Sequence, residues 1–219
     1  LDMTTRGRNV SVIFGDGAGA VVMTRTESNS IGILNSQLHS EGKHAKELSL
    51  IGPSTGRWVP EIMKENNPED ISYYPFMNGQ FVFKNAVVRF TEVINAGLKK
   101  AGWKPNEIDM LIPHQANLRI AQFVQKKFGL SDNQVYNNIQ RYGNTTAASI
   151  PIALTEAWEE GKIEKGNKVV LAAFGYMLSN IIAYEKLQKI DSFTITTFAT
   201  TFGALFSLPF FIYDLSSSS

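Results

Sequence analysis

The sequence contains no cysteine among its 219 residues. Disulfides, thiolate metal sites and a cysteine nucleophile are therefore excluded within this chain. The sequence also lacks an excess of either charge, because 21 Lys and Arg residues are balanced by 20 Asp and Glu residues, which leaves a net charge of +1. This balance excludes a strongly basic nucleic-acid coat and an acidic tail, but not a local charged patch.

The two ends of the chain lack the signals of a secreted protein. No basic segment followed by an apolar run occurs near Leu1, so no signal peptide is predicted and we expect a cytoplasmic protein. Because the chain starts without an initiator methionine, we expect a part of the protein to precede it. Residues 192–213 carry no charge and are numerous enough to span a bilayer. Their Thr and Ser content and Pro209 argue against a membrane helix, and a foreign or frame-shifted tail is at least as good an interpretation.

What the sequence does contain is an alternation of helical and strand patterns. With 43% apolar and 19% charged residues, the chain can bury a sizeable core. Apolar residues recur at helical spacing in three segments, and four short apolar runs are typical of buried strands. The predicted helices cover residues 81–101, 118–128 and 147–160, and the predicted strands cover residues 10–14, 21–23, 108–112 and 169–174. The sequence therefore predicts an α/β fold with a mainly parallel, helix-covered sheet.

A glycine-rich segment, residues 15–20, matches the G-x-G-x-x-A pattern of dinucleotide-binding turns. That pattern binds phosphate only where a strand precedes it and a helix follows it. Here the residues that follow, 21–23, have a strand pattern instead. The better hypothesis is that these small residues let two backbone segments pack closely.

A second short motif, G-x-S-x-G at residues 52–56, matches the nucleophile turn of α/β-hydrolases. Asp109 and His114 follow Ser54 in the order that hydrolases use. The turn requires a strand before it and a helix after it, and Pro53 and the polar sequence beyond it do not fit. A serine hydrolase using Ser54 is therefore kept as an alternative only.

Two of the three histidines lie close together in the sequence, as the ligands of a metal site could. His39 and His44 flank Glu41, but their spacing fits no common metal site and the segment has the composition of a loop. We therefore predict no metal.

His114 occupies a more informative position, directly after the predicted strand 108–112 and Pro113. Ligands of open α/β sheets bind at the carboxyl ends of parallel strands. Asn144 lies in a polar turn just before the third predicted helix. Position alone leaves open whether each residue has a functional or a structural role. As structural residues, His114 could be a core histidine and Asn144 could be a helix N-cap.

Several longer motifs resemble those of one enzyme family. Residues 113–119 (PHQANLR) and 141–151 (RYGNTTAASIP) are similar to the His and Asn motifs of β-ketoacyl-acyl-carrier-protein synthase III. Segments at residues 4–7 and 14–20 and, more loosely, 77–84 resemble that family in the same order. The likeness extends from the start of the chain to about Phe174 and fades towards Lys186.

The resemblance implies a thiolase-like fold, a layered α/β architecture of two similar halves that usually forms a homodimer. Residues 1–80 would then be the end of the first half with a loop-rich connection. Residues 81–186 would be the second half with the His and Asn motifs, and residues 187–219 an atypical, largely uncharged tail.

The resemblance also implies an acyltransferase of fatty-acid biosynthesis that catalyses a decarboxylating condensation. An acyl group passes from coenzyme A to an enzyme cysteine, and malonyl-acyl-carrier-protein then loses carbon dioxide and attacks the acyl thioester. His114 and Asn144 match the catalytic His and Asn of the family. A neutral imidazole and an amide, both held in place, can stabilise the enolate that decarboxylation generates. No cofactor is implied beyond the coenzyme A thioester substrate.

Other matched positions concern binding. By resemblance, the residues that line the coenzyme A entrance are Arg6, Gly7, Gly79, Asn117 and Arg119. The basic positions that contact the acyl carrier protein are Lys84, Arg119, Lys126 and Lys127. A basic patch would steer an acidic partner of this kind. Without the resemblance, Lys126 and Lys127 would be interpreted as an ordinary basic helix C-terminus.

The sequence departs from the family in two places. The family's cysteine nucleophile would lie upstream of Leu1, so the chain as given should not catalyse the condensation. Tyr176 stands where the family usually has a glycine of the turn that helps to form an oxyanion hole, and a tyrosine fits poorly if that turn needs positive φ. A non-condensing relative that binds acyl-CoA or transfers an acyl group is therefore a further alternative.

Overall fold

The structure, a computed structural model, describes residues 8–49 and 76–174 except residues 24, 26 and 29. The chain divides into two compact units, Leu1–Gln37 with Met77–Gly175 and Leu38–Phe76 with Tyr176–Ser219. Several expectations fall outside the described residues, namely those for Arg6, Gly7, Ser54, Tyr176 and the uncharged tail.

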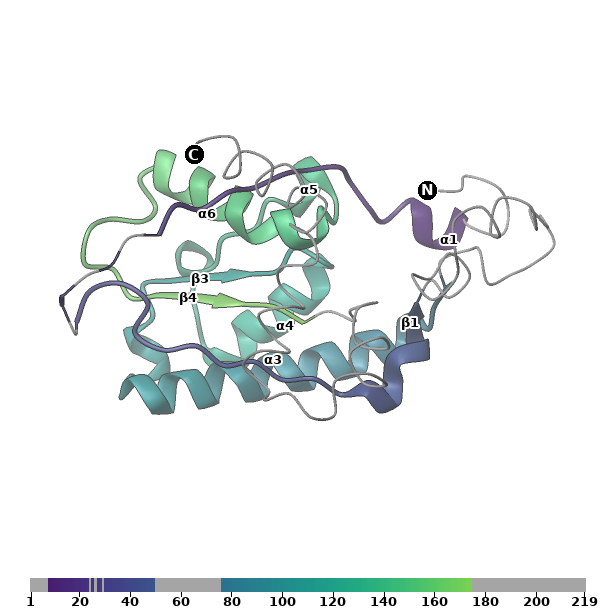
Figure 1. Cartoon of the computed structure of the whole chain (residues 1–219), viewed down its shortest axis with the longest axis horizontal. Coiled ribbons are helices and arrows are strands. Elements are labelled where there is room, and N and C mark those ends of the chain that lie inside the picture. Colours follow the sequence, from purple (N-terminus) through teal and green to yellow (C-terminus); the bar gives the residue numbers. More distant parts are fainter. Residues whose placement is uncertain (1–7, 24, 26, 29, 50–75, 175–219) are drawn as a thin grey trace, which may run out of the picture. The chain divides into compact units, whose positions relative to one another are not determined.

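The centre of the first unit is a pair of parallel strands, β3 (Met110–Pro113) and β4 (Val169–Ala172), shown in Figure 1. The two strands are aligned residue by residue from their first to their last positions. The predicted strands at 108–112 and 169–174 and their parallel pairing are thus confirmed. Strand β3 begins two residues later than predicted, because the preceding residues form the short 3-10 helix η3 (Pro105–Glu107) and its exit.

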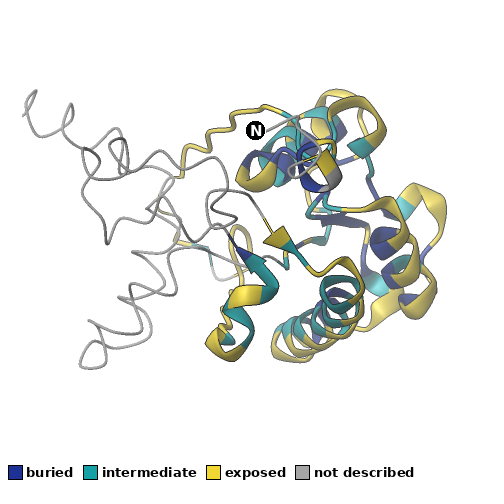
Figure 2. Cartoon of the chain, turned by 90° about the vertical axis from the view of Figure 1, so that its right-hand side faces the viewer, coloured by how far each residue is buried: buried dark blue, intermediate teal, exposed yellow. Residues whose placement is uncertain are grey.

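Helices cover both faces of this strand pair. In Figure 1, α3 (Gly79–Ala101) and α4 (Leu118–Phe128) lie on one side and α6 (Ser149–Glu159) on the other. Side chains of β3 alternate accordingly, since Leu111 packs in the core with α3 and α4 while Met110 and Ile112 pack in a second core with α6. Figure 2 shows buried residues along the strands and exposed residues on the outer helix surfaces. This arrangement is the helix-covered sheet that the sequence predicted.

The two long helices begin and end at residues suited to those positions. Asn78 and Asn117 are the N-caps, and each side chain accepts a hydrogen bond from an N–H of the first turn. Gly102 and Gly129 follow the last turns of α3 and α4 and adopt the left-handed conformation. The N–H of each glycine donates to carbonyl oxygens in the last turn of its own helix. These local signals explain why the helices predicted at 81–101 and 118–128 are confirmed almost residue for residue.

The connection from α4 to α6 consists of three short helices. They are η4 (Asp132–Gln134), α5 (Ile139–Tyr142) and η5 (Thr146–Ala148). Because η5 runs directly into α6, the third predicted helix, 147–160, starts as a 3-10 turn and becomes α-helical at Ser149. Pro151 lies in the first turn of α6, where its missing N–H leaves no hydrogen bond unmade.

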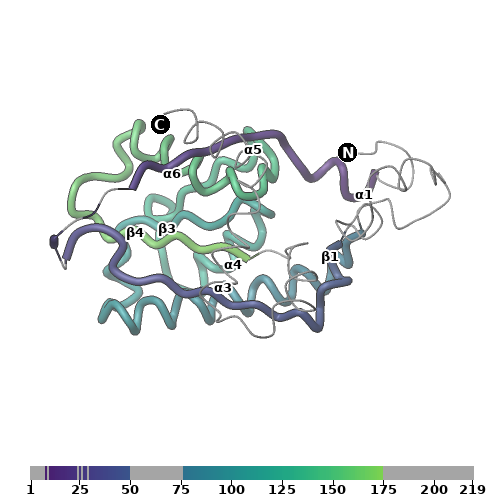
Figure 3. The backbone as a smooth tube through the Cα atoms, in the orientation of Figure 1, coloured from purple at the N-terminus to yellow at the C-terminus, as the bar shows by residue number. Residues whose placement is uncertain are grey.

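The N-terminal part of the first unit differs from the prediction. Residues 10–14 and 21–23 were expected to be strands, but the structure has α1 (Arg8–Ser11) and an irregular segment in their place. Only Phe14 forms a strand-like bridge, parallel to Asn144. Figure 3 shows this segment running past α5 and along α6. Both strand predictions are therefore wrong, because within the described residues this segment packs against a loop and a helix that offer no strand edge.

The described part of the second unit is small. Helix η1 (Gly42–Glu47) leads into β1 (Leu48–Ser49), which forms a two-stranded sheet with β2 (Phe76–Met77). In neither unit does a described helix combine the length and the apolarity that crossing a membrane requires.

Candidate active site

His114 directly follows β3, and its backbone is fixed by the neighbouring strand. Its N–H donates to the carbonyl oxygen of Ala172, the last residue of β4, at 2.7 Å. Its own carbonyl oxygen accepts from Ala116 N–H at 2.9 Å, which closes a tight turn before α4. The strand pairing thus continues one residue beyond β3 and sets the position from which the imidazole projects.

The side chain of His114 is partly buried and held in one orientation. Its Nδ1 lies 2.6 Å from Oγ of Ser149, the first residue of α6. Burial lowers the pKa of His114 from 6.5 to about 4, because a charged imidazole would lose its hydration there. The ring is therefore neutral at pH 7 and can donate from one nitrogen while accepting at the other.

The buried ring should make the protein sensitive to acid. An unfolded histidine has a pKa near 6.5, whereas the folded His114 has a pKa of about 4. Between these values the unfolded chain binds a proton that the folded chain does not, so stability that is present above pH 6.5 is lost as the pH falls towards 4. Between pH 7 and pH 5, we expect the free energy of unfolding to fall by about 2 kcal/mol through this group alone.

Urea unfolding of the parent chain and of His114→Gln at several pH values measures this contribution. Carboxylates titrate in both proteins, so the difference between the two curves isolates the histidine. Equal slopes between pH 7 and pH 5 would show that His114 is not buried as described.

Gln115, the next residue, fastens the His114 turn to the loop before α5. The side chain is 3% exposed. Its Nε2 donates to the carbonyl oxygens of Pro113 and Tyr136, and its Oε1 accepts from the N–H groups of Asn138 and Ile139. A buried amide with all these partners stabilises one backbone arrangement. Sequence reasoning missed this role, because the four partners lie up to 24 residues away.

Asn144 is buried and its backbone is clamped to the N-terminal segment. Its N–H donates to Ile13 and its carbonyl oxygen accepts from Gly15 N–H, both at 3.0 Å. The side-chain Oδ1 accepts from Thr146 N–H, two residues further on, at 2.9 Å, which closes an Asx turn. The N-caps of η5 and α6 are Thr145 and Ala148, so the N-cap interpretation of Asn144 is wrong. The Nδ2 donor has no hydrogen-bond partner within 8–49 and 76–174, so the turn leaves this group free for another interaction.

The glycine-rich segment makes this clamp possible. A Cβ at Gly15 would lie 1.9 Å from the carbonyl oxygen of Tyr142, and one at Gly19 would lie 2.4 Å from Cβ of Pro151. Such distances are far inside van der Waals contact, so only glycine fits. The hypothesis of close backbone packing is confirmed, and the dinucleotide pattern has no helix after it.

A polar cluster anchors the motif around Asn144 to α6. Glu156 accepts hydrogen bonds from Arg141 Nη2 and Asn138 Nδ2, each at 2.7 Å, and from the hydroxyl of Tyr142. Arg141 also donates to the hydroxyl of Tyr136 at 3.0 Å. These contacts hold both ends of α5 against one helix, so Asn144 follows a fixed turn.

The remaining matched positions lie on the surface. Asn117 caps α4, Arg119 occupies its first turn, and Gly79 opens α3. The side chains of Arg119, Lys84, Lys126 and Lys127 are exposed, and no carboxylate of the described segments lies within ion-pair distance of them. Basic side chains of the two helices α3 and α4, which pack against each other, are thus free to meet an anionic ligand or partner.

The hydrolase alternative fails on geometry. Asp109 precedes β3 whereas His114 follows it, and five strand-like steps of about 3.3 Å separate their Cα atoms by about 16 Å. The Asp109 carboxylate instead accepts from Lys168 N–H at 2.7 Å, at the other end of the strand pair. A triad of Ser54, Asp109 and His114 is therefore wrong, irrespective of Ser54, which lies outside the described residues.

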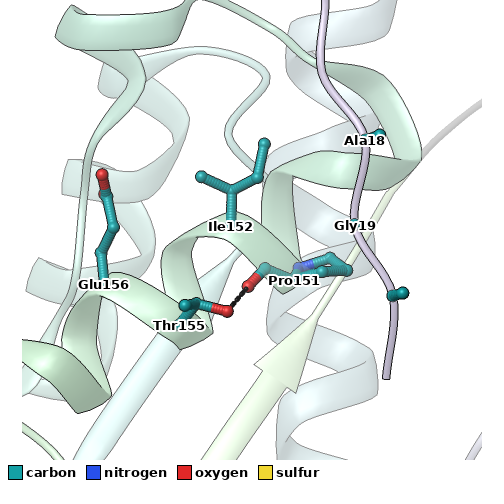
Figure 4. Close-up of a pocket in the computed structure, with 7 residues that line it drawn as sticks. Ala18, Gly19, Pro151, Ile152, Thr155 and Glu156 are labelled. Atoms are coloured by element: carbon teal, nitrogen blue, oxygen red, sulfur yellow. Dashed lines mark hydrogen bonds between the residues drawn. The ribbon is translucent and has the colours of Figure 1, made fainter. Parts of the chain in front are cut away.

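Two further kinds of site, a metal site and a pocket, were open to the described residues. Within the described segments, no three His, Cys, Asp or Glu side chains gather as a metal site would require. A pocket lies against α6 (Figure 4), and neither His114 nor Asn144 is among the residues that line it. Its lining comes from two segments of the first unit, with Ala18, Gly19, Ala20, Pro151, Ile152, Thr155 and Glu156.

Comparison with known proteins identifies the family of the chain. Residues 98–185 match the family model described as 3-oxoacyl-(acyl-carrier-protein) synthase III, C-terminal, and residues 1–42 match the 3-oxoacyl-(acyl-carrier-protein) synthase III model. The β-ketoacyl-acyl-carrier-protein synthase III of Caldanaerobacter subterraneus subsp. tengcongensis is 43% identical over 186 residues, covering 83% of this chain and 54% of that protein. The Aquifex aeolicus enzyme of the same name is 42% identical over 168 residues. The match covers 77% of this chain and 48% of the Aquifex protein.

Solved structures show the same relationship. The crystal structure of 3-oxoacyl-acyl-carrier-protein synthase III from Aquifex aeolicus superposes with a TM-score of 0.65 at 42% identity, covering 77% of this chain and 48% of that one. The Thermus thermophilus structure gives a TM-score of 0.55 at 37% identity. The match covers 63% of this chain and 40% of the Thermus chain. The chain spans about half the length of the curated relatives it matches. With both family models matched in order and a thiolase-like α/β fold, the chain belongs to the β-ketoacyl-acyl-carrier-protein synthase III family.

Proposed function

We propose that this chain carries the second half of an acyltransferase of fatty-acid biosynthesis, which condenses an acyl-CoA with malonyl-acyl-carrier-protein and releases carbon dioxide. One observation carries the proposal: the two matched motifs each present a fixed N–H donor. His114 is tied to the first residue of α6, and Asn144 lies on the turn that leads into that helix. The ring is neutral, and the amide oxygen is occupied while its nitrogen is free.

The donors fit the charge that decarboxylation creates. When the malonyl C–C bond breaks, its electron pair moves into the thioester carbonyl, whose oxygen becomes negative. Two N–H groups aimed at this oxygen stabilise the enolate without first having to reorganise. The Asn144 side chain does not titrate, and a His114 with a pKa of about 4 is neutral at pH 7. Both side chains are therefore uncharged donors near neutral pH.

The carbanion then attacks an acyl thioester on a cysteine, and the new C–C bond forms as the thiolate leaves. This chain has no cysteine, so the nucleophile in our proposal comes from the first half of the fold. Residues 1–80 would complete that half and connect it to residues 81–186, and the full-length protein would be a cytoplasmic homodimer. Residues 187–219 have no role in the proposal.

The surface positions fit the proposed substrates. Asn117 and Arg119 lie three and five residues after His114, at the start of α4. Exposed arginine can bind the phosphates of coenzyme A through two donors at once. Lys84, Lys126 and Lys127 add positive charge on α3 and α4, which favours an acidic carrier protein.

Thermal unfolding of the full-length protein with coenzyme A tests the binding part of the proposal. We expect the melting temperature to rise with ligand concentration, because coenzyme A binds only the folded state. In Arg119→Ala, the loss of one charge-assisted contact should raise the concentration needed for the same rise about tenfold.

Lys165→Ala is the matched control, since it also removes an exposed cation. Lys165 precedes β4 and thus lies at the opposite end of the strands from His114. It should respond to coenzyme A as the parent protein does. No stabilisation by coenzyme A or any acyl-CoA would count against the proposal. Stabilisation without release of carbon dioxide from malonyl-acyl-carrier-protein would instead favour the non-condensing relative.

A further inference from the structure

Ser149 is a buried residue at the start of a helix, where a serine side chain usually caps the helix by accepting from a backbone N–H. It is 2% exposed and is the first residue of α6. Its side chain, however, does not cap the helix, since no hydrogen bond from Ser149 Oγ to α6 is present. The hydroxyl faces His114 Nδ1 at 2.6 Å and receives Gln115 N–H at 3.4 Å.

The direction of the Ser149–His114 hydrogen bond follows from the partners of the hydroxyl. A serine hydroxyl has one hydrogen to donate and two lone pairs that accept. If the ring donated from Nδ1, Oγ would accept from both neighbours, and its own hydrogen would be buried with no acceptor among the described residues. A buried donor without a partner costs about 1–3 kcal/mol. If the hydroxyl donates to Nδ1, every group is satisfied.

We propose that Ser149 is a positioning residue: its hydroxyl donates to Nδ1 of His114 and thereby confines the single ring proton to Nε2. In a neutral imidazole, the nitrogen that accepts cannot carry the proton. Nε2 has no hydrogen-bond partner in the described part of the chain, so its N–H points to a group that the protein does not supply.

The consequence for catalysis rests on the proposed function. The enolate oxygen needs a donor, and a ring in the other tautomer would present a lone pair to a developing negative charge. Ser149 would therefore turn a ring with two nearly equal tautomers into a permanent donor. The hydroxyl also fixes the ring plane, because Ser149 is held by α6 and His114 by β4.

The tautomer can be observed directly in this chain, without any catalysis. Multiple-bond proton–nitrogen correlation spectra of 15N-histidine-labelled protein at pH 7 distinguish a ring protonated at Nε2 from one protonated at Nδ1. The chain has three histidines, and His39→Gln and His44→Gln identify the signals of His114 by elimination. We expect His114 to show the pattern of a neutral ring with its proton on Nε2.

Ser149→Ala should remove this preference. The shifts of the two ring nitrogens should move towards each other as both tautomers become populated. Thr155→Ala is the matched control, because it removes a hydroxyl from the same helix whose one hydrogen bond to a described residue goes to the carbonyl oxygen of Pro151, at 3.0 Å. It should leave the His114 spectrum unchanged.

A proton on Nδ1 in the parent chain would overturn the proposal without recourse to any variant. An unchanged tautomer in a folded Ser149→Ala would overturn it as well. If Ser149→Ala does not fold, Ser149→Cys, which keeps a weak donor of similar size, should retain the Nε2 tautomer. Because the spectra involve no substrate, a protein that fails to decarboxylate malonyl thioesters would refute the proposed function and leave this result standing.

Discussion

Replacing Gly15 by alanine is expected to lower the free energy of unfolding by about 3 kcal/mol, at the upper end for an overpacked site. The new Cβ would lie 1.9 Å from the carbonyl oxygen of Tyr142 and 3.1 Å from its carbonyl carbon. A backbone carbonyl cannot turn aside as the tip of a flexible side chain can. The two segments must therefore move apart, and no local adjustment of a rotamer relieves the contact.

The separation breaks the contacts that hold Asn144. Gly15 N–H donates to the Asn144 carbonyl oxygen, and Asn144 N–H donates to Ile13, so one displacement weakens both hydrogen bonds. Each contributes about 1 kcal/mol. A loss of stability at Gly15 should therefore be accompanied by a loss of order at Asn144.

Urea unfolding measures the first effect, and amide hydrogen exchange at Asn144 and Gly15 measures the second. Gly97→Ala is the matched control in the same unit. A Cβ there would meet only Asn35 Oδ1 at 3.9 Å, and the position lies within α3. Alanine in a helix interior is favoured over glycine, so this variant should be more stable by about 1 kcal/mol. A Gly15→Ala protein as stable as its parent would show that the segments do not pack as closely as described.

The elements predicted well from sequence are those whose signals are local. Helix α4 is flanked by its N-cap Asn117 and its C-cap Gly129, and the apolar stripe between these two caps already specifies which face is buried. Strand β3 is a short apolar run, and its position before His114 placed the histidine at a strand end. In both cases, a few neighbouring residues contain the information.

The elements predicted badly depend on partners that the local pattern does not show. Residues 10–14 and 21–23 are apolar enough for strands, but a strand also needs an adjacent backbone edge. Ser149 is 35 residues from His114 in the sequence, so its role depends on how β3 meets α6. Gln115 likewise lies in a matched motif, yet its contacts with the loop before α5 follow only from the fold.

The second large effect is expected at the proposed pair of donors. In the full-length protein, His114→Ala and Asn144→Ala should each slow carbon dioxide release from malonyl-acyl-carrier-protein by about 100- to 1000-fold, which corresponds to about 2.7–4 kcal/mol of barrier. The double variant should lose less than the product of the two factors, since both donors serve one oxygen.

Substitutions at Asn144 can separate catalysis from the turn that its side-chain oxygen closes. The Oδ1 atom accepts from Thr146 N–H, whereas the proposal needs the Nδ2 donor. Asn144→Asp keeps an acceptor for Thr146 and removes the amide donor, so it should lose decarboxylation. Because Asn144 is buried, the new carboxylate should also lower the free energy of unfolding. The aspartate adds a negative charge near the enolate. Asn144→Ser is therefore the neutral comparison, since its hydroxyl can also accept from Thr146 N–H.

The measured rates then decide between the two roles of this residue. A residue that only closes the turn would tolerate both Asp and Ser in the rate of decarboxylation, because the side-chain oxygen of each can accept from an N–H two residues further on. A residue that also donates to the enolate would tolerate neither, although both variants remain folded. Carbon dioxide release within threefold of the parent rate in a folded Asn144→Asp protein would therefore assign Asn144 to structure alone. The stabilisation of the enolate would then depend on His114 without a second donor from this turn.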